Sequence, residues 1–134
     1  MLFRVLGPLE VEDGVARITI AGERSRALLT ALLLRPNTAV PATRLVDVLW
    51  GAEPPDDPAN ALHQAVRRLR VQLGPLGEVV RTRAPGYLLA VDRTCVDAEL
   101  FERGCRAARR LAATDPHQAV AQLDEALGLW RGPA

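Results

Sequence analysis

The fold of this chain is decided by the stretch DPANALHQAVRRLRVQLG, residues 57–74. Asp57 and Pro58 form a helix-start signal, because the carboxylate can cap free backbone amides and proline fits the first helical position. The apolar side chains that follow are spaced by four, three and four residues: Leu62, Val66, Leu69 and Leu73. Because this spacing places them on one face, the sequence predicts an amphipathic helix over 58–73 whose apolar stripe packs on other helices.

The opposite face of this predicted helix is polar and basic. At about 100° per residue, the side chains that point away from the apolar stripe are Asn60, Gln64, Arg67, Arg68 and Val71, with His63 and Arg70 on one flank. In the major groove of DNA, arginine makes a forked contact with guanine, and glutamine or asparagine can pair with the adenine edge. The face therefore fits base reading, and the alternative is an ordinary solvated helix surface.

A β-hairpin is predicted directly after this helix. Residues 79–83 (VVRTR) and 87–91 (YLLAV) flank Ala84-Pro85-Gly86, where proline and glycine suit the two central positions of a type II turn. Arg81 and Arg83 lie two residues apart, so we expect them on one face of the strand, within reach of phosphate or a minor groove. The alternative is that these arginines only protect an exposed strand edge.

The distribution of charge supports a nucleic-acid surface, although the formal net charge is only +1. Residues 58–83 carry five arginines and one acid, whereas residues 51–57 carry three acids, Glu53, Asp56 and Asp57. Positive charge is thus concentrated on one helix and the hairpin that follows it, which is the pattern of a DNA-binding face.

Strands and helices are also predicted before residue 57. Strand-like segments cover residues 2–6, 9–12 and 15–20. Asp13-Gly14 favours a two-residue hairpin turn in which both residues have positive φ. Apolar stripes predict two helices, over 24–35 with Leu28, Leu29, Leu32 and Leu33, and over 42–50 with Leu45, Val48 and Leu49. Residues 51–57 then form the loop between the second and third helices.

Beyond Asp92 the sequence changes character and predicts a separate helical unit. Residues 97–113 and 117–130 are alanine-rich and amphipathic, and Thr114-Asp115-Pro116 separates them. We expect an antiparallel pair in which Leu100, Phe101, Ala108 and Leu111 face Val120, Leu123, Leu127 and Trp130. The predicted division is therefore a domain over 1–93 and an incomplete helical domain over 97–134.

Seven phrases in this order resemble one family of bacterial regulators. They are RALLTALLLRPN, LVDVLWG, PPDDPANAL, VRRLRVQLG, APGYLL, VDAELFE and ALGLWRGPA. The order of elements resembles the OmpR/PhoB-type winged helix, and the phrases together are similar to the Streptomyces antibiotic regulatory protein (SARP) family. The resemblance covers the whole chain and implies an α+β winged helix-turn-helix, followed by the start of a tetratricopeptide-like bacterial transcriptional activation domain.

The resemblance also implies roles for individual residues. Arg67, Arg68 and Arg70 match the family's recognition helix, and Arg81 and Arg83 match its wing. We expect Arg68 to contact a base and Arg67, Arg70 and Asn60 to contact phosphate, with an internal ion pair as the alternative for Arg70. His63-Gln64-Ala65 is not the family's most usual sequence at the centre of the helix, so the operator cannot be carried over.

By the same resemblance, the chain activates antibiotic-pathway genes from directly repeated sites, bound side by side as a possible dimer. The resemblance also implies that RNA polymerase holoenzyme is engaged through the winged helix and the activation domain. The loop over 51–57, with the acids Glu53, Asp56 and Asp57, occupies the position at which the wider class contacts polymerase. The alternative is a protein-interaction scaffold whose winged helix no longer binds DNA.

Other classes of protein find little support in the sequence. No catalytic Ser-His-Asp or Cys-His grouping and no Gly-rich phosphate loop is evident, so we expect neither an enzyme nor a cofactor. His63 and His117 are not at metal-ligand spacing from Cys95 or Cys105, and the cysteines are expected to be free thiols without a role. Neither a secretory signal nor a membrane-length apolar run is present, so a cytoplasmic protein without a membrane partner is expected.

Overall fold

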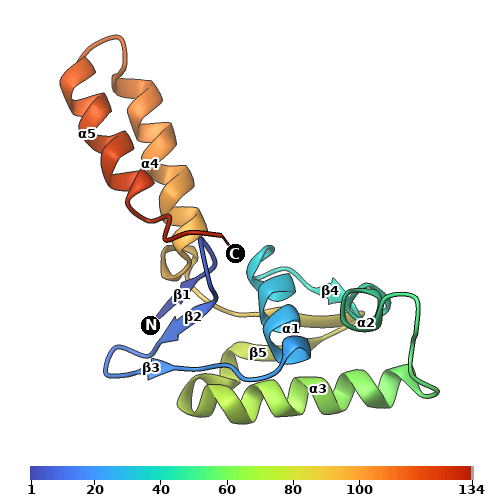
Figure 1. Cartoon of the computed structure of the whole chain (residues 1–134). Helices are drawn as coiled ribbons and strands as arrows, with labels where there is room; N and C mark the ends of the chain where they lie inside the picture. The colour runs from blue at the N-terminus through green and yellow to red at the C-terminus, as the bar shows by residue number, and fades with distance from the viewer. Residues whose placement is uncertain (134) are drawn as a thin grey trace.

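The computed structural model describes residues 1–133, and its α+β architecture confirms the predicted fold (Figure 1). A three-stranded antiparallel sheet is followed by three helices, with one short strand between the first and second of them. Two further strands then complete a second three-stranded sheet, and a hairpin of two helices follows. The helical hairpin projects from one side of the molecule, and helix α3 lies along the opposite edge (Figure 1). Among the described residues, no helix combines the length and apolarity needed to cross a membrane.

The first sheet is built from strands β1 (Leu2–Arg4), β2 (Glu10–Glu12) and β3 (Arg17–Ile18), in that order. The predicted hairpin between β2 and β3 exists, but its predicted turn is wrong. Gly14 has a φ of 100°, whereas Asp13 does not have positive φ. The Asp13 carboxylate instead accepts hydrogen bonds from the amides of Ala16 (2.8 Å) and Val15 (2.7 Å), which lower its pKa.

Three helices enclose the main core. They are α1 (Glu23–Leu33), α2 (Ala42–Trp50) and α3 (Pro58–Leu73), and the predicted limits of α2 and α3 are confirmed. Every predicted core residue of α1 and α3 is buried, since their apolar stripes pack on one another. On α2, Leu45 and Leu49 are buried, but Val48 is 49% exposed and lies outside the core. That part of the prediction was wrong, because Val48 faces open hollows beside α1 rather than the core.

The second sheet holds the predicted hairpin together with a strand that the sequence did not indicate. Its order is β4 (Val40–Pro41), β6 (Gly86–Leu89) and β5 (Val80–Arg83), all antiparallel. Short 3₁₀ helices at Gly74–Val79 and Arg93–Cys95 flank the hairpin on its two sides in the chain. The hairpin is therefore held along β6 by the segment that leads into α2.

The predicted type II turn at the hairpin tip is wrong. The two turn residues are Ala84 and Pro85, joined by a cis peptide bond, and Gly86 already belongs to β6, opposite Arg83. Gly86 is needed for a different reason than turn conformation. A Cβ atom there would collide with the backbone carbonyl of Val40 and lie 2.7 Å from the Ala42 amide. Glycine thus permits the close approach of β4 to β6.

Asn37 fixes the end of the hairpin to the end of α1. Its side-chain amide donates to the Val91 carbonyl (2.7 Å) and accepts from the Val91 amide (3.0 Å), and its own backbone amide donates to Leu89 (2.8 Å). Asn37 adopts a φ of 62°, a conformation that asparagine tolerates better than most residues. This residue therefore sets where the strand leaves the winged-helix core.

Helices α4 (Asp97–Leu111) and α5 (Pro116–Leu127) form the projecting hairpin; Ala108 of the predicted α4 face is buried, whereas the predicted inner face of α5 is wrong. The α5 residues buried against α4 are Ala119 and Ala126, and a Cβ on Gly104 would lie only 2.8 Å from the Ala126 Cβ. The predicted inner stripe of α5 is instead exposed, by 57% at Val120, 40% at Leu123 and 57% at Leu127. Small residues let the helices approach closely, and that approach turns the bulky stripe outward. Of the predicted contacts, Phe101 does meet Trp130, edge to face at 5.8 Å.

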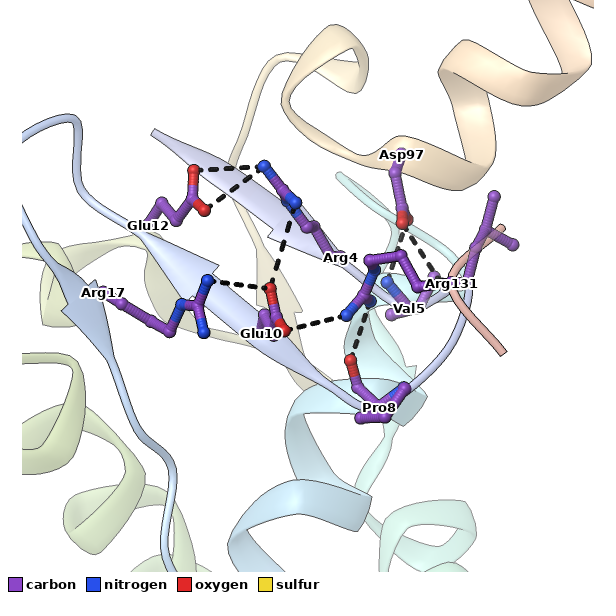
Figure 2. Close-up of polar contacts among 9 residues, drawn as sticks. Arg4, Val5, Pro8, Glu10, Glu12, Arg17, Asp97 and Arg131 are labelled. Atoms are coloured by element: carbon purple, nitrogen blue, oxygen red, sulfur yellow. Dashed lines mark hydrogen bonds and ion pairs between the residues drawn. The ribbon is translucent and has the colours of Figure 1, made fainter. Parts of the chain in front are cut away.

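A buried carboxylate joins the helical hairpin to the first sheet (Figure 2). Asp97, at the start of α4, is 2% exposed and accepts hydrogen bonds from the amides of Val5 (2.8 Å) and Leu6 (3.2 Å). Next to it, Phe3 and Val96 form a parallel β-bridge. The first turn of α4 is thus attached to the end of β1.

Arg131, which follows α5, makes a second attachment to the same region (Figure 2). Its guanidinium pairs with Glu10 (3.0 Å) and donates to the Pro8 carbonyl (2.7 Å), while its backbone amide donates to Leu6 (3.0 Å). Glu10 also lies near Arg4 and Arg17, at 3.9 and 3.8 Å. Both ends of the helical hairpin are therefore held by the first sheet.

Candidate nucleic-acid interface

The outer face of α3 is a polar, basic surface that no other element covers. Asp57 caps the helix by accepting a hydrogen bond from the Asn60 amide (3.2 Å), which fixes where the helix begins. The predicted contact residues that are exposed along the helix are Asn60, His63, Gln64, Arg67 and Arg68. Within residues 1–133, none of the ion pairs involves Arg67 or Arg68. Both guanidinium groups are therefore available to a partner.

Arg70 has a different environment from the other two arginines of the helix. Its Nε donates to the Val80 carbonyl (2.9 Å), and Nη2 donates to the Thr82 hydroxyl (3.2 Å). The internal ion pair considered for this residue is wrong, because its partners are an uncharged carbonyl and a hydroxyl on β5. Arg70 ties the hairpin to α3, and this sets the distance between the two basic elements.

The hairpin carries its two arginines on an exposed strand. Arg81 and Arg83 are both exposed and alternate with Val80 and Thr82 along β5. Since successive strand residues point to opposite faces, Arg81 and Arg83 share one face, and Thr82 lies on the face that Arg70 reaches. A shallow hollow between α3 and the hairpin is lined by Arg67, Arg70, Arg81 and Thr82 among others. The structure thus brings Arg81 together with Arg67 and Arg70 around one hollow, which Glu78 also lines, whereas Arg83 does not line it.

The sequence analysis missed two residues at this surface: Gln72, which holds α3 in place, and Arg24, which borders it. Gln72 accepts a hydrogen bond from the Ala21 amide (2.6 Å) and donates to the Ala21 carbonyl (3.1 Å) and the Ser25 hydroxyl (2.9 Å). Arg24, at the start of α1, lies over the Trp50 ring at 5.2 Å and lines the same hollow as Arg68. Only the place of Gln72 beside the apolar stripe hinted at its role, and no local pattern marked Arg24.

The acidic loop lies at the N-terminal end of α3. Glu53, Asp56 and Asp57 are exposed, and the loop runs between α2 and α3 away from the helical hairpin (Figure 1). Asp57 already serves as the helix cap, so Glu53 and Asp56 are the two acids of the loop without that structural task. Cys95 and Cys105 are free cysteines, and the described residues hold no His, Cys, Asp and Glu cluster suited to a metal ion.

Comparison with known families and structures accounts for both parts of the chain. The family "Transcriptional regulatory protein, C terminal" matches residues 19–89, and the family "Bacterial transcriptional activator domain" matches residues 96–134. The structure of EmbR from Mycobacterium tuberculosis, in complex with a low affinity phosphopeptide, superposes with a TM-score of 0.91 at 30% identity. That superposition covers 99% of this chain and 36% of the other.

Individual relatives are regulators from Streptomyces and Mycobacterium. The transcriptional regulator RedD of Streptomyces coelicolor is 37% identical over 97% of this chain, and the regulatory protein DnrI of Streptomyces peucetius is 35% identical over 100% of this chain. The chain spans 39% of the first relative and 53% of the second. These relatives and both domain families are transcriptional regulators rather than enzymes. The chain belongs to the Streptomyces antibiotic regulatory protein family of transcriptional regulators.

Proposed function

We propose that this chain binds duplex DNA in a sequence-specific manner, with α3 in the major groove and the β5–β6 hairpin as the wing beside it. The observation that carries the proposal is the outer face of α3, where Gln64, Arg67 and Arg68 are exposed on the edge of the molecule opposite the helical hairpin. An α-helix fits the major groove, and amide and guanidinium groups match the donors and acceptors of its base edges.

Individual contacts follow from where each side chain lies. Arg68 is the proposed base-reading arginine, because it is exposed on the outer face of α3, away from the flank that Arg70 occupies. Arg67 and Asn60 are proposed phosphate contacts: Arg67 is an exposed basic side chain on the outer face, and Asn60 lies in the first turn of the helix, where backbone amides attract anions. His63 and Gln64 lie between them, while Arg70 is proposed to touch phosphate only with the donors left after its two bonds to β5.

The wing contributes a second set of phosphate contacts. Arg81 and Arg83 share a strand face near the hairpin tip, so they are proposed to reach phosphate or a minor groove adjacent to the site of α3. Because these contacts carry no base identity, they strengthen binding to every sequence by a similar factor. The hydrogen bonds of Arg70 keep the wing at a fixed offset from the reading helix.

Activation is proposed to involve surfaces that remain free when α3 is in the groove. The exposed loop acids Glu53 and Asp56, with Asp57, are proposed to meet a basic surface of RNA polymerase holoenzyme. Residues 1–93 would form the DNA-binding domain and 97–134 the start of the activation domain. Family membership supports control of antibiotic-pathway genes from directly repeated sites bound side by side, in the cytoplasm.

One observation favours the alternative of a protein-interaction scaffold. The α5 stripe of Val120, Leu123 and Leu127 is exposed and apolar, which is typical of a protein-contact surface. A scaffold of this kind would use the helical hairpin and leave the face of α3 without a partner. The two proposals therefore differ in whether the winged helix binds DNA.

The deciding experiment is selection of bound sequences from random duplex DNA, followed by anisotropy titration of the best sequence at two salt concentrations. We expect a directly repeated motif whose affinity falls steeply with salt, because phosphate contacts release counterions. The double variant Arg67→Ala/Arg68→Ala should lose the motif preference. The matched control is Arg109→Ala/Arg110→Ala, which removes the same charge from two exposed positions on α4.

Each outcome assigns the function differently. Loss of binding with the α3 variant but not with the α4 variant supports reading by α3. Equal losses in both variants would mean that net charge alone attracts DNA. No enriched sequence, with weak binding that is indifferent to salt, would favour the scaffold.

A further inference from the structure

We propose that Val71 recognises the 5-methyl group of a thymine in the bound site, an inference that rests on the proposed insertion of α3 into the major groove. Val71 is 74% exposed, although it is a branched apolar side chain in a regular helix. Residues 62, 66, 69 and 73 of the same helix supply its buried stripe. Packing within the chain therefore gives no reason for an apolar residue at position 71.

The place of Val71 on the helix is the centre of the outward face. It follows Gln64 by seven residues, which is about 700° of rotation at about 100° per residue, or roughly 20° short of two full turns. The two side chains thus point almost the same way, about 10 Å apart along the helix axis at 1.5 Å per residue. When Gln64 points into the groove, Val71 points to its floor two turns further along.

Arginines enclose this apolar side chain. Val71 lies one turn after Arg67 and Arg68, and with Gln64 and Gln72 these residues line a shallow hollow on the surface of α3. Val71 also lines the hollow that faces Arg81 on the wing. Two α3 arginines and one wing arginine would hold DNA around Val71, so water would be excluded from its methyl groups in the complex.

Thymine supplies the one apolar group that a base edge presents in the major groove, the 5-methyl group. Valine can neither donate nor accept a hydrogen bond, so its side chain cannot read any other feature of those edges. Valine is also a weaker helix former than alanine, arginine or glutamine. Both helix propensity and exposure disfavour valine at this position in the free protein, and a methyl contact in the complex compensates for both.

The test removes one methyl group at a time from the DNA. In the sequence selected with the wild-type chain, each thymine is replaced in turn by deoxyuridine, and dissociation constants are measured by anisotropy for wild type and Val71→Ala. At one thymine per half-site we expect wild-type binding to weaken about fourfold, the factor for one buried methylene-sized group. Val71→Ala should show no penalty for uracil at that position.

Val120→Ala is the matched control, since it shortens an exposed valine on α5, in the hairpin that projects away from α3. This variant should keep the full uracil penalty. Circular dichroism of Val71→Ala should show an unchanged or slightly more stable fold, because alanine is the better helix former.

The outcomes separate this inference from the proposed function. A selected sequence without uracil sensitivity, or a Val71→Ala variant with an undiminished penalty, overturns the thymine contact while leaving DNA binding by α3 intact. A selected site that lacks thymine overturns it as well. Failure to select any sequence overturns both proposals together.

Discussion

Replacing Asp97 by alanine tests whether the helical hairpin is held to the winged helix by one buried carboxylate. Asp97 is 2% exposed and accepts hydrogen bonds from the Val5 and Leu6 amides. Alanine would leave both amides without a partner, and a buried donor that loses its acceptor costs about 1–3 kcal/mol. Because Val5 is only partly buried, water can satisfy its amide in part, so we expect the free energy of unfolding to fall by about 3 kcal/mol.

Asp97→Ala should lower the free energy of unfolding and loosen the structure only near the joint. Urea denaturation followed by circular dichroism gives the free energy of unfolding, and hydrogen exchange reports which amides lose protection. Exchange should increase in β1 and α4, whereas α3 should keep its protection and affinity for the selected DNA should stay within about twofold, since its packing does not involve the joint.

The control variant is Glu102→Ala on the same helix. Glu102 is exposed and pairs with Arg106 at 3.8 Å, and a surface pair of this kind contributes less than about 0.5 kcal/mol. A loss below about 1 kcal/mol for Asp97→Ala, or a loss equal to that of Glu102→Ala, would refute the assignment of Asp97 as the joint.

Two further predictions concern the wing. Gly86→Ala should lower the free energy of unfolding by about 3 kcal/mol, since the added Cβ collides with the Val40 carbonyl and must separate β4 from β6; a stable variant in urea titration would contradict that contact. Arg70→Met keeps the aliphatic stem but removes the hydrogen bonds to Val80 and Thr82. We expect the free energy of unfolding to fall by about 1–2 kcal/mol and hydrogen exchange in β5 to become faster. Unchanged exchange would show that other contacts hold the wing.

Local signals explain why the limits of α3 could be predicted to the residue. The aspartate cap, the proline at the first turn and the glycine after Leu73 act within a few residues, and tertiary packing does not alter them. The same periodicity that placed Leu62 and Leu69 in the core placed Arg67 and Arg68 outside it. The candidate DNA surface on α3 could therefore be predicted from the sequence.

Competing local signals explain the errors. Asp-Gly and Pro-Gly are both strong turn signals. In the first turn, however, the Asp13 carboxylate accepts a backbone hydrogen bond and Asp13 has no positive φ. In the second, Gly86 lies in β6 and leaves room for the backbone of β4. On α5 the sequence offers two stripes, one of alanines and one of larger apolar residues. Gly104 leaves space only for a small residue of α5, so the alanine stripe faces inward. The prediction assumed that the more hydrophobic stripe is buried, and for α5 that assumption was wrong.

The sequence by itself determined the winged-helix order of elements, the limits of α2 and α3 and the basic outer face of α3, because these depend on neighbours within one or two helical turns. Only the tertiary structure decided the bonds of Arg70 to the wing, the anchoring of α3 by Gln72 and the joint at Asp97. At the joint, Asp97 is separated in sequence from Leu6 by 91 positions and from Val5 by 92 positions. The contacts of Gln72 with Ser25 and Ala21 span 47 and 51 positions. No periodic pattern records such pairs, since each depends on how separate elements pack.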